Sequence, residues 1–305
     1  MADTSGMAEI RGINIDKLAK GFADEANVMK KYVTVTPTGA REIRWYQKTS
    51  GFLDTTDTTG LSLSRMGTDQ LAMPEVMEQS WTRRTSYVRK YFIESPTISS
   101  EDIKDSDIDV LATNVRDIVR GVARQVDQRI IMMLTNAAEE TPTTPLTDTS
   151  TYGAVQTAAS TDEWDQVATA KPITDILNAK QKIRAEGYDP EGCMMGMNSI
   201  EHKLLLAYLI ETKGSSIPNW SSTKLDSGVV MNLLGTNIVV SENFTTDWVT
   251  LWVPSRSLTW KSFMPITSVV MDEPGIGKKI RCWEEGEALL TDRNSVFVIS
   301  NTGVQ

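Results

Sequence analysis

The 305-residue sequence predicts an α+β fold in which one long amphipathic helix is flanked by sheet. Three observations carry this prediction. Residues 99–138 keep one apolar face over many turns, extended segments precede them at 41–47 and 81–98, and residues 257–300 read almost entirely as strand and turn. Because sheet lies on both sides of the helix in the sequence, we expect the chain to leave one sheet and return to it later.

The predicted helix has an apolar stripe and a charged face. The stripe recurs at steps of three and four, at Ile108, Leu111, Val115, Ile118, Val119, Val122, Val126, Ile130, Met133 and Ala137. The opposite face, which we expect to meet water or a charged partner, carries Asp105, Asp109, Arg116, Arg120, Arg124 and Asp127. Ser99 or Ser100 would cap its start, and residues 141–145 would end it. Such a rod would be roughly 55 Å long, so it needs sheet along it to bury the stripe.

The first 98 residues contain an arm and two extended segments. Residues 1–40 are too short and polar for a core of their own and are expected to lie on something else. Between the strand predicted at 41–47 and the segment at 81–98 runs a long Gly-, Thr- and Ser-rich connection, which is typical of a loop that reaches outward. Both faces of 81–98 mix aromatic and charged residues. This mixture fits burial between subunits and equally fits an ordinary hairpin with a mobile tip.

A denser α/β region follows the Thr-, Ala- and Pro-rich residues 139–171. Pro172 opens a helix that Gly187 ends, and residues 193–197 form a short apolar strand. Asn198, together with Glu201, is expected to cap the next helix. Two more strands are predicted at 235–244 and 247–254, and a hairpin tip at 274–277.

The amino-acid composition and charge of the chain exclude several classes of function. The net charge of −9 and the pI near 4.9 argue against tight generic binding to nucleic acid, which needs clustered cations. No apolar run is long enough to span a membrane, and the first residues show no secretion signal. Cys193 and Cys282 are expected to be small buried hydrophobic residues rather than a disulfide or zinc ligands.

Candidate chemistry is sparse. His202 is the only histidine and is expected to be a surface or packing residue. Residues 275–279, GIGKK, lack the other elements of a phosphate loop and fit a hairpin tip. The carboxylates Glu284, Glu285 and Glu287 are expected to be a solvated charge run at a strand end rather than a cation site. The sequence therefore predicts no catalytic residue, no cofactor and no metal site.

The order of these elements resembles the major capsid proteins of tailed bacterial and archaeal viruses, which have the Hong Kong 97 fold. The residues that carry the resemblance are VDQRIIMMLTNAA at the end of the long helix, the block ILNAKQKIRAEGYDPEGCMMGMNSIEHKLLL, LLGTNIVVSEN, and the closing strands. The resemblance covers most of residues 10–300. Its specificity lies in the succession of elements, because no single motif is diagnostic.

The resemblance implies a division of the chain into five parts. Residues 1–40 would be an N-terminal arm, 41–80 an extended loop that overlaps a neighbouring subunit, and 81–140 a peripheral domain with the long helix as its spine. Residues 141–255 would form most of an axial domain. Residues 256–305 would complete the peripheral sheet and return to the axial domain.

The resemblance also implies a structural, non-enzymatic function. Copies would assemble as hexamers and pentamers into an icosahedral shell around packaged double-stranded DNA, in the virion and, during assembly, in the host cytoplasm. The residues expected to contact neighbouring subunits are Trp45, Lys48, Phe52, Leu53, Trp81, Arg83, Arg84 and Arg89. Separate scaffolding, portal and decoration proteins are possible partners, and no membrane is expected. Because only about 40 residues precede the first strand, a separate scaffolding protein or none is expected.

Some members of the family join a loop lysine to an asparagine of a neighbour. Lys48 with Asn294 or Asn301 could be nominated, although no pattern selects them. Three other functions are weighed against the viral shell. An encapsulin-type nanocompartment resembles the same fold, an enzyme could have its site within 172–253, and a tail or adhesion protein would be expected to show repeats or a strict heptad.

Overall fold

The computed structural model describes residues 29–48, 81–105, 110–135, 155–166, 169–212 and 232–303, which fall into two compact units. The first unit takes its described residues from Met1–Ile43, Thr85–Ile131 and Thr259–Leu289. The second takes them from Arg44–Arg84, Met132–Leu258 and Leu290–Gln305. Each unit is therefore built from segments that lie far apart in the sequence.

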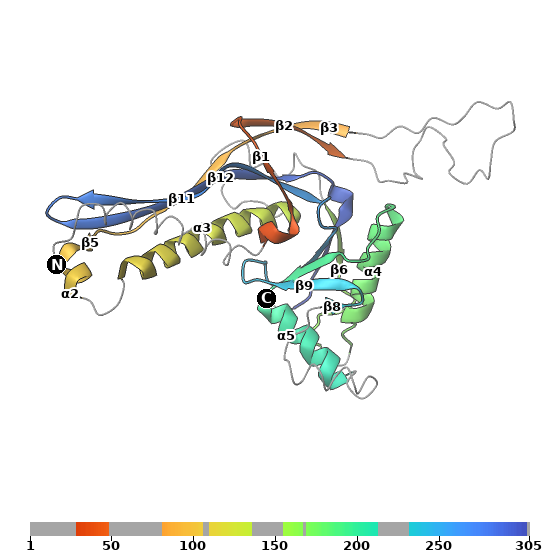
Figure 1. The fold of residues 1–305 in the computed structure, drawn as a ribbon. Coiled ribbons are helices and arrows are strands. Elements are labelled where there is room, and N and C mark those ends of the chain that lie inside the picture. The colour runs from red at the N-terminus through yellow and green to blue at the C-terminus, as the bar shows by residue number, and fades with distance from the viewer. Residues whose placement is uncertain are drawn as a thin grey trace, which may run out of the picture. The chain divides into compact units, whose positions relative to one another are not determined.

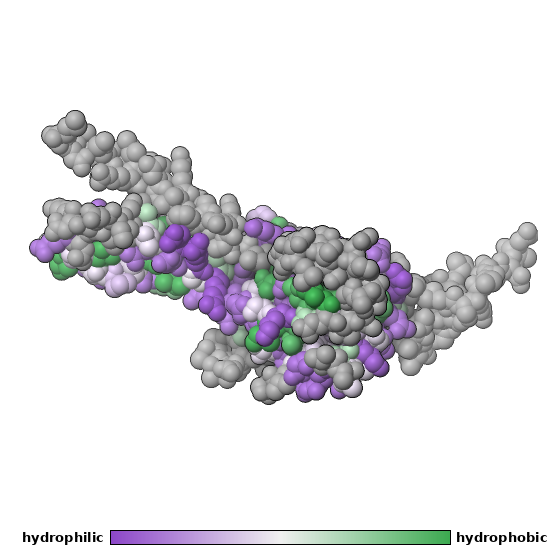
Figure 2. Space-filling model, turned by 90° about the horizontal axis from the view of Figure 1, so that it is seen from below, coloured by the Kyte–Doolittle hydropathy of each residue, from purple (hydrophilic) through white to green (hydrophobic). Residues whose placement is uncertain are grey.

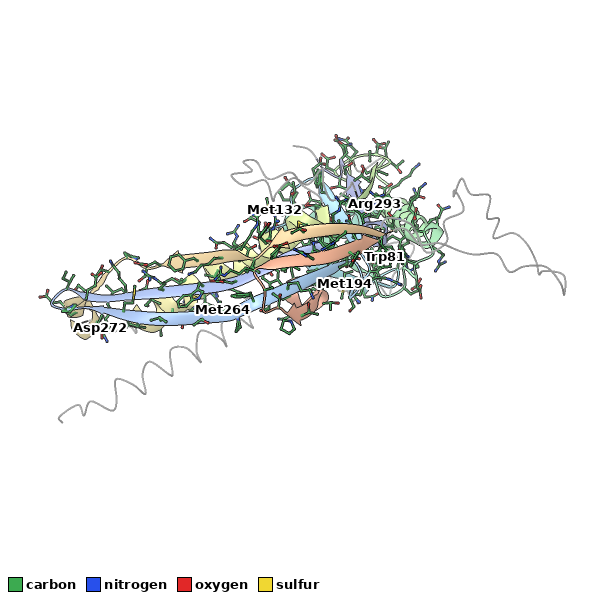
Figure 3. All side chains as sticks on the ribbon, turned by 90° about the horizontal axis from the view of Figure 1, so that it is seen from above. Trp81, Met132, Met194, Met264, Asp272 and Arg293 are labelled. Carbon is green, nitrogen blue, oxygen red and sulfur yellow. The ribbon has the colours of Figure 1, made fainter. Side chains whose placement is uncertain are left out.

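The first unit consists of a long hairpin, three shorter strands and the long helix (Figure 1). Its elements are η1 (Met29–Tyr32), β1 (Thr34–Pro37), β4 (Arg89–Glu94), β5 (Ile98–Ser99), α2 (Ser100–Asp105), α3 (Val110–Thr135), β11 (Leu258–Glu273) and β12 (Gly277–Leu290). The strand order is β1-β11-β12-β4, with β5 also paired to β12. Asp272 lies near the tip of the β11–β12 hairpin (Figure 3).

Strands from both sides of α3 in the sequence meet in this sheet, as predicted. β4 pairs with β12 in antiparallel register, with Phe92 opposite Trp283, and β1 pairs with β11 in parallel, with Val35 opposite Trp260. The prediction did not include β1. Its residues belong to the segment expected to be an arm. The strand has only four residues, TVTP, and ends in a proline, so its sequence signal is weak in spite of the threonines and the valine.

The apolar stripe of α3 is buried against the hairpin, as predicted (Figure 1). Val115, Val119 and Val122 have no exposed surface and pack in one cluster with Ile280 and Cys282. The described helix has 26 residues, about 39 Å. The expected start forms the separate helix α2, while residues 106–109 and 136–138 lie outside the described residues.

The prediction of the charged face is wrong for one residue, Asp127. Asp127 is 2% exposed, and its Oδ1 accepts a hydrogen bond of 3.1 Å from the backbone N–H of Met29, which is itself fully buried. The helical period puts Asp127 beside the stripe, where a partner distant in sequence satisfies its carboxylate. The expectation that this residue faces water was wrong.

The second unit holds a six-stranded mixed sheet with helices. Its elements are β6 (Gln156–Ala159), α4 (Pro172–Ala185), β7 (Met194–Met197), α5 (Ser199–Ala207), the π-helix η3 (Tyr208–Thr212), β8 (Asn232–Leu233), β9 (Thr236–Val240), β10 (Trp248–Trp252), η4 (Arg293–Ser295) and β13 (Val296–Ser300). The order β6-β13-β10-β7-β9-β8 combines parallel β6/β13 and β7/β9 pairs with antiparallel neighbours.

Helix signals in this unit are confirmed with one exception. Pro172 opens α4, Gly187 follows it at φ +84°, and the Asn198 side chain accepts a 3.2 Å bond from the N–H of Ile200. Glu201 does not complete the capping box that was expected. It is buried, and its Oε1 instead accepts a 2.6 Å bond from the N–H of Asp247.

Cys193 and Cys282 are both buried free thiols, as the sequence indicates, and burial raises the pKa of Cys193 to about 11. Within the described residues, no helix combines the length and apolar character that crossing a membrane requires. The five-part division into arm, loop, peripheral and axial segments stays a prediction.

A charge placed on the buried stripe of α3 should prevent folding of the first unit. Val119→Asp or Val122→Asp would bury an unpaired carboxylate and should cost several kcal/mol, giving insoluble protein. Arg120→Asp is the matched control, because it puts the same side chain at an exposed position of the helix. Solubility and thermal melting measure the effect, and equal behaviour of the Val119 and Arg120 variants would show that the buried face is misassigned.

Candidate functional site

The two-stranded sheet of β2 (Glu42–Lys48) and β3 (Trp81–Tyr87) frames the long connection 49–80. Val88 N–H bonds to Arg41 O at 2.9 Å at one end, and Arg84 Nε bonds to Gln47 Oε1 at 3.3 Å toward the other, so the strands run antiparallel. The predicted strand at 41–47 and the start of the extended segment at 81–98 are thus confirmed. Trp81 lies at the end of this ribbon (Figure 3).

The ribbon has one buried and one exposed side. Burial alternates along β2, because Trp45 and Gln47 are buried while Arg44 and Tyr46 are exposed. The bond between Arg84 and Gln47 puts these two side chains on the same side, so the alternate residues lie on the other side. The exposed side, here called the ribbon face, carries Arg44, Tyr46, Trp81 and Arg83.

The ribbon face has the composition of a protein interface. Tyr46 is 61% exposed and Trp81 is 53% exposed. Tyrosine, tryptophan and arginine are enriched at interfaces between proteins, where large aromatic side chains supply most of the contact area. Two exposed aromatic rings flanked by Arg44 and Arg83 therefore give the ribbon face a composition typical of protein interfaces.

The six predicted contact residues that the structure describes fall into three groups. Trp81 and Arg83 are exposed on the ribbon face. Trp45 and Lys48 are buried within the chain, at 6% and 4% exposure. Arg84 and Arg89 are partly buried and bonded, Arg84 to Gln47 and Arg89 Nε to Glu287 Oε2 at 3.2 Å. Phe52 and Leu53 lie outside the described residues. Contact of these residues with a neighbouring subunit stays a prediction.

The end of β2 is held within the second unit by backbone and side-chain bonds. Gln47 Nε2 donates to the carbonyl of Leu290 at 3.1 Å, and the N–H of Lys48 donates to the carbonyl of Thr291 at 3.0 Å. Lys48 Nζ reaches the hydroxyl of Tyr188 at 3.2 Å, and this hydroxyl donates to Asp292 Oδ2 at 2.7 Å. Lys48, the last described residue before the connection 49–80, is therefore held by both its backbone and its side chain.

The groups at this position are shifted in pKa mainly by burial. Burial raises the pKa of Asp292 and lowers that of Lys48, and each shift is opposed by the attraction between the two charges. Burial and the bond to Asp292 also raise the pKa of the Tyr188 hydroxyl. With its Nζ bonded inside the chain, Lys48 does not present an amine to a neighbouring asparagine in this conformation. Asn294, one of the two nominated asparagines, donates to Glu186 Oε2 at 3.2 Å.

The carboxylates of β12 are buried, so the expectation of a solvated charge run was wrong. Glu284, Glu285 and Glu287 are 1%, 5% and 3% exposed. Three other elements and one loop supply their cations: Lys30 of η1 to Glu284, Arg41 to Glu285, and both Arg89 of β4 and Arg129 of α3 to Glu287. The apolar residues around them, Cys282 and 288–290, were the sequence signal for burial.

Other titratable groups form no reaction centre among the described residues. No group of three or more His, Cys, Asp or Glu side chains in this part of the chain could hold a metal ion. His202 is partly buried, and burial lowers its pKa. A hollow of about 200 Å³ between α4 and β6 contains Asp175, but this carboxylate accepts bonds from Thr161 and from Trp164 Nε1.

Removing Glu287 should destabilise the first unit far more than removing Glu285. Glu287→Gln removes the carboxylate that Arg129, whose side chain is 6% exposed, shares with Arg89, at a cost of about 3–5 kcal/mol. Glu285→Gln is the matched control, because its partner Arg41 is 68% exposed and the change should cost less than about 1 kcal/mol. Urea denaturation measures both, and equal losses of stability would refute the assignment of the buried pair.

Asp292 should make stability depend on pH in a defined direction. Because its folded pKa is raised, the folded state holds this proton more tightly, and the contribution falls as pH rises from the ordinary aspartate pKa through the raised value. The stability of wild type relative to Asp292→Asn should therefore decrease over this range. Urea denaturation at a series of pH values measures the difference, and an increase with pH would contradict the shift.

Comparison with known proteins identifies the architecture. The sequence matches no family model and has no significant match among curated protein sequences. Solved structures do match. A virus-like particle from Pyrococcus furiosus aligns with TM-score 0.62 and 10% identity over 95% of this chain and 99% of its own.

Two phage structures match equally well. Mycobacterium phage Che8 aligns with TM-score 0.62 and 15% identity over 91% of this chain and 92% of its own. The capsid of Cyanophage P-SCSP1u aligns with TM-score 0.62 and 13% identity over 91% and 89%. Both the long helix against a hairpin and the separate mixed sheet are included in alignments of this extent. The chain has the Hong Kong 97 fold, as the order of its elements predicted.

Proposed function

We propose that this chain is the repeating subunit of a closed protein shell. The observation that carries the proposal is the match in fold, over about nine tenths of both chains, to proteins described as capsids or as a virus-like particle. A shell subunit needs large surfaces for other copies and no reaction centre. The exposed aromatic and arginine side chains of the ribbon face support such a surface.

The shell is proposed to be an icosahedral viral capsid of hexamers and pentamers that encloses double-stranded DNA. Matches to several phage capsids favour this function. The subunit would be found in the virion and, during assembly, in the host cytoplasm. Separate scaffolding, portal and decoration proteins stay predictions.

A nanocompartment of the encapsulin type is the second candidate. It is favoured by the match to the virus-like particle from Pyrococcus furiosus, which covers 95% of this chain. The two functions differ in what the shell contains. Particles purified from the native source would contain packaged DNA in the first case and a cargo enzyme in the second, so extraction of nucleic acid and protein from nuclease-treated particles separates them.

Assembly is tested by expressing the full chain alone and imaging it by electron microscopy. Closed particles with fivefold and sixfold clusters of subunits are expected. A compact monomer or dimer at high protein concentration would contradict the proposal and would favour the alternative of an enzyme.

Deleting residues 50–72 should leave the subunit folded but prevent stable shells, because we expect this stretch to make contacts only between chains. Circular dichroism and thermal melting test folding, and electron microscopy tests assembly. Normal particles from the deleted form would show that the assignment of the loop is wrong.

A point variant tests the ribbon face without shortening the chain. Trp81→Glu puts a charge where a neighbouring subunit is proposed to cover an aromatic ring, and it should reduce assembly at least tenfold while leaving the melting temperature of the subunit unchanged. Ile200→Glu is the control, because Ile200 is similarly exposed, at 50%, on α5. Equal loss of assembly in both variants would mean that added charge, not the ribbon face, is responsible.

A further inference from the structure

A hollow in the second unit lies between α4 and β6, which is the last strand in the order of the described sheet. α4 packs against β13, the neighbour of β6, and the small side chain of Ala158 on β6 leaves the space beside the helix open. The volume of the hollow is about 200 Å³. It is here called the α4–β6 hollow and is defined by Ala158, Asn178, Gln181, Lys182, Phe297 and Ile299.

The lining of the hollow combines an apolar floor with polar groups from α4. Alanine, phenylalanine and isoleucine side chains of β6 and β13 supply the floor. α4 supplies the carboxamides of Asn178 and Gln181 and the ammonium group of Lys182. Asp175 also borders the hollow, but its carboxylate already accepts bonds from the N–H and the hydroxyl of Thr161. The hollow thus offers an apolar surface, two amides and a cation.

An indole ring matches this lining in size and in chemistry. A cavity of about 150 Å³ takes up benzene, so the hollow has room for a larger aromatic ring. A buried indole N–H needs an acceptor, and the carboxamide oxygens of Asn178 and Gln181 are of the right kind. An ammonium group such as that of Lys182 is attracted to the face of an aromatic ring, most strongly to that of tryptophan.

The ribbon face presents an indole with a matching charge beside it. Trp81 is 53% exposed, and Arg83 is exposed on the same side of the ribbon. At the rim of the hollow, the acidic residues Asp162 and Glu163 directly follow Thr161, which is one of the lining residues. Neither Arg83 nor Asp162 has an ion-pair partner among the described residues. The two surfaces are therefore complementary in charge as well as in the fit of the ring.

We propose that Trp81 of one copy of the chain inserts into the α4–β6 hollow of a second copy. The inference rests on the proposed shell function and names the surface that covers the ribbon face. Both surfaces belong to the second unit. Because the indole is exposed and the hollow is open in the same chain, the contact joins two copies.

Such a contact is heterologous, since it joins different surfaces of two identical chains. A heterologous contact repeats from copy to copy and closes into a ring where the rotation allows it. The proposed hexamers and pentamers need a contact of this kind. Its mixed character, an aromatic anchor with a charged rim, also agrees with the surface in Figure 2, where hydrophobic patches lie among hydrophilic residues.

Cross-linking between two single-site cysteine variants of the full chain tests the contact. Arg83→Cys in one copy and Asp162→Cys in the other place thiols beside the ring and at the rim, and leave Trp81 intact. Arg83→Cys with Ile200→Cys is the matched control, because Ile200 is 50% exposed on α5. The two native cysteines are buried. The mixed variants are treated with a short bismaleimide, linked peptides are measured by mass spectrometry, and particles are imaged by electron microscopy.

The yield of the link between positions 83 and 162 should exceed that of the control about tenfold or more, because a contact raises the effective concentration of the two thiols. Equal yields in particles that close normally would overturn the inference and leave the shell function standing. A selective link in open oligomers that never close would support the contact and refute the shell. A monomeric chain without a selective link would overturn both.

A variant that fills the hollow gives a second test. Ala158→Phe places a ring where the indole is proposed to lie and should reduce assembly about tenfold. Thr157→Phe is the matched control, because Thr157 is exposed on the same strand but is not a lining residue of the hollow. Both replaced side chains are exposed, so the melting temperature of the subunit should not change in either variant. Equal effects of the two variants on assembly would contradict the proposed contact.

Discussion

The packing of α3 against the β11–β12 hairpin is the interaction on which the first unit depends. A two-stranded hairpin of this length cannot stay ordered in water alone, and an isolated helix gains little from its own hydrogen bonds. Each therefore supplies the apolar surface that the other needs, through the valines of α3 and residues such as Ile280 and Cys282. Neither element could be shortened without exposing the partner's apolar side.

Charge pairs then fix the register of the elements around this core. Glu284 and Glu287 of β12 hold Lys30 of η1, Arg89 of β4 and Arg129 of α3. Buried ion pairs add little net stability compared with apolar packing, but a displaced element would leave one charge unpaired at high cost. These pairs thus favour one arrangement of the strands and the helix, since apolar contacts alone tolerate sliding.

Much of the fold could be predicted because its signals are periodic or local. The stripe on α3, the Pro172 start and the Asn198 cap of the helices, and the hairpin tip at 274–277 each depend on residues close in sequence. The errors at Asp127 and Glu284, Glu285 and Glu287 have another origin. Whether a charge is buried depends on partners such as Met29 and Arg129, about 100 or more residues away, which no local pattern specifies.

At the candidate site, too, local sequence signals predicted the strands but not which residues are buried. Alternation along 41–47 predicted a strand and residues 81–98 an extended segment, but both sides of the ribbon carry aromatic and charged residues, so sequence could not say which side is exposed. Only the bond from Arg84 to Gln47 and the burial of Trp45 and Lys48 make this distinction. Lys48 looked like a loop residue because its partner Tyr188 is contributed from a distant helix end.

The interleaving of the chain has a consequence for its synthesis. β1 and β4 leave the ribosome early, yet among the described strands their partners are those of the β11–β12 hairpin, and β6 pairs with β13, which ends at Ser300. Neither sheet can close until translation is almost finished, so half-made chains carry open strand edges and an uncovered helix stripe. Nascent chains would therefore be natural clients of chaperones that shield hydrophobic surfaces until the final strands emerge.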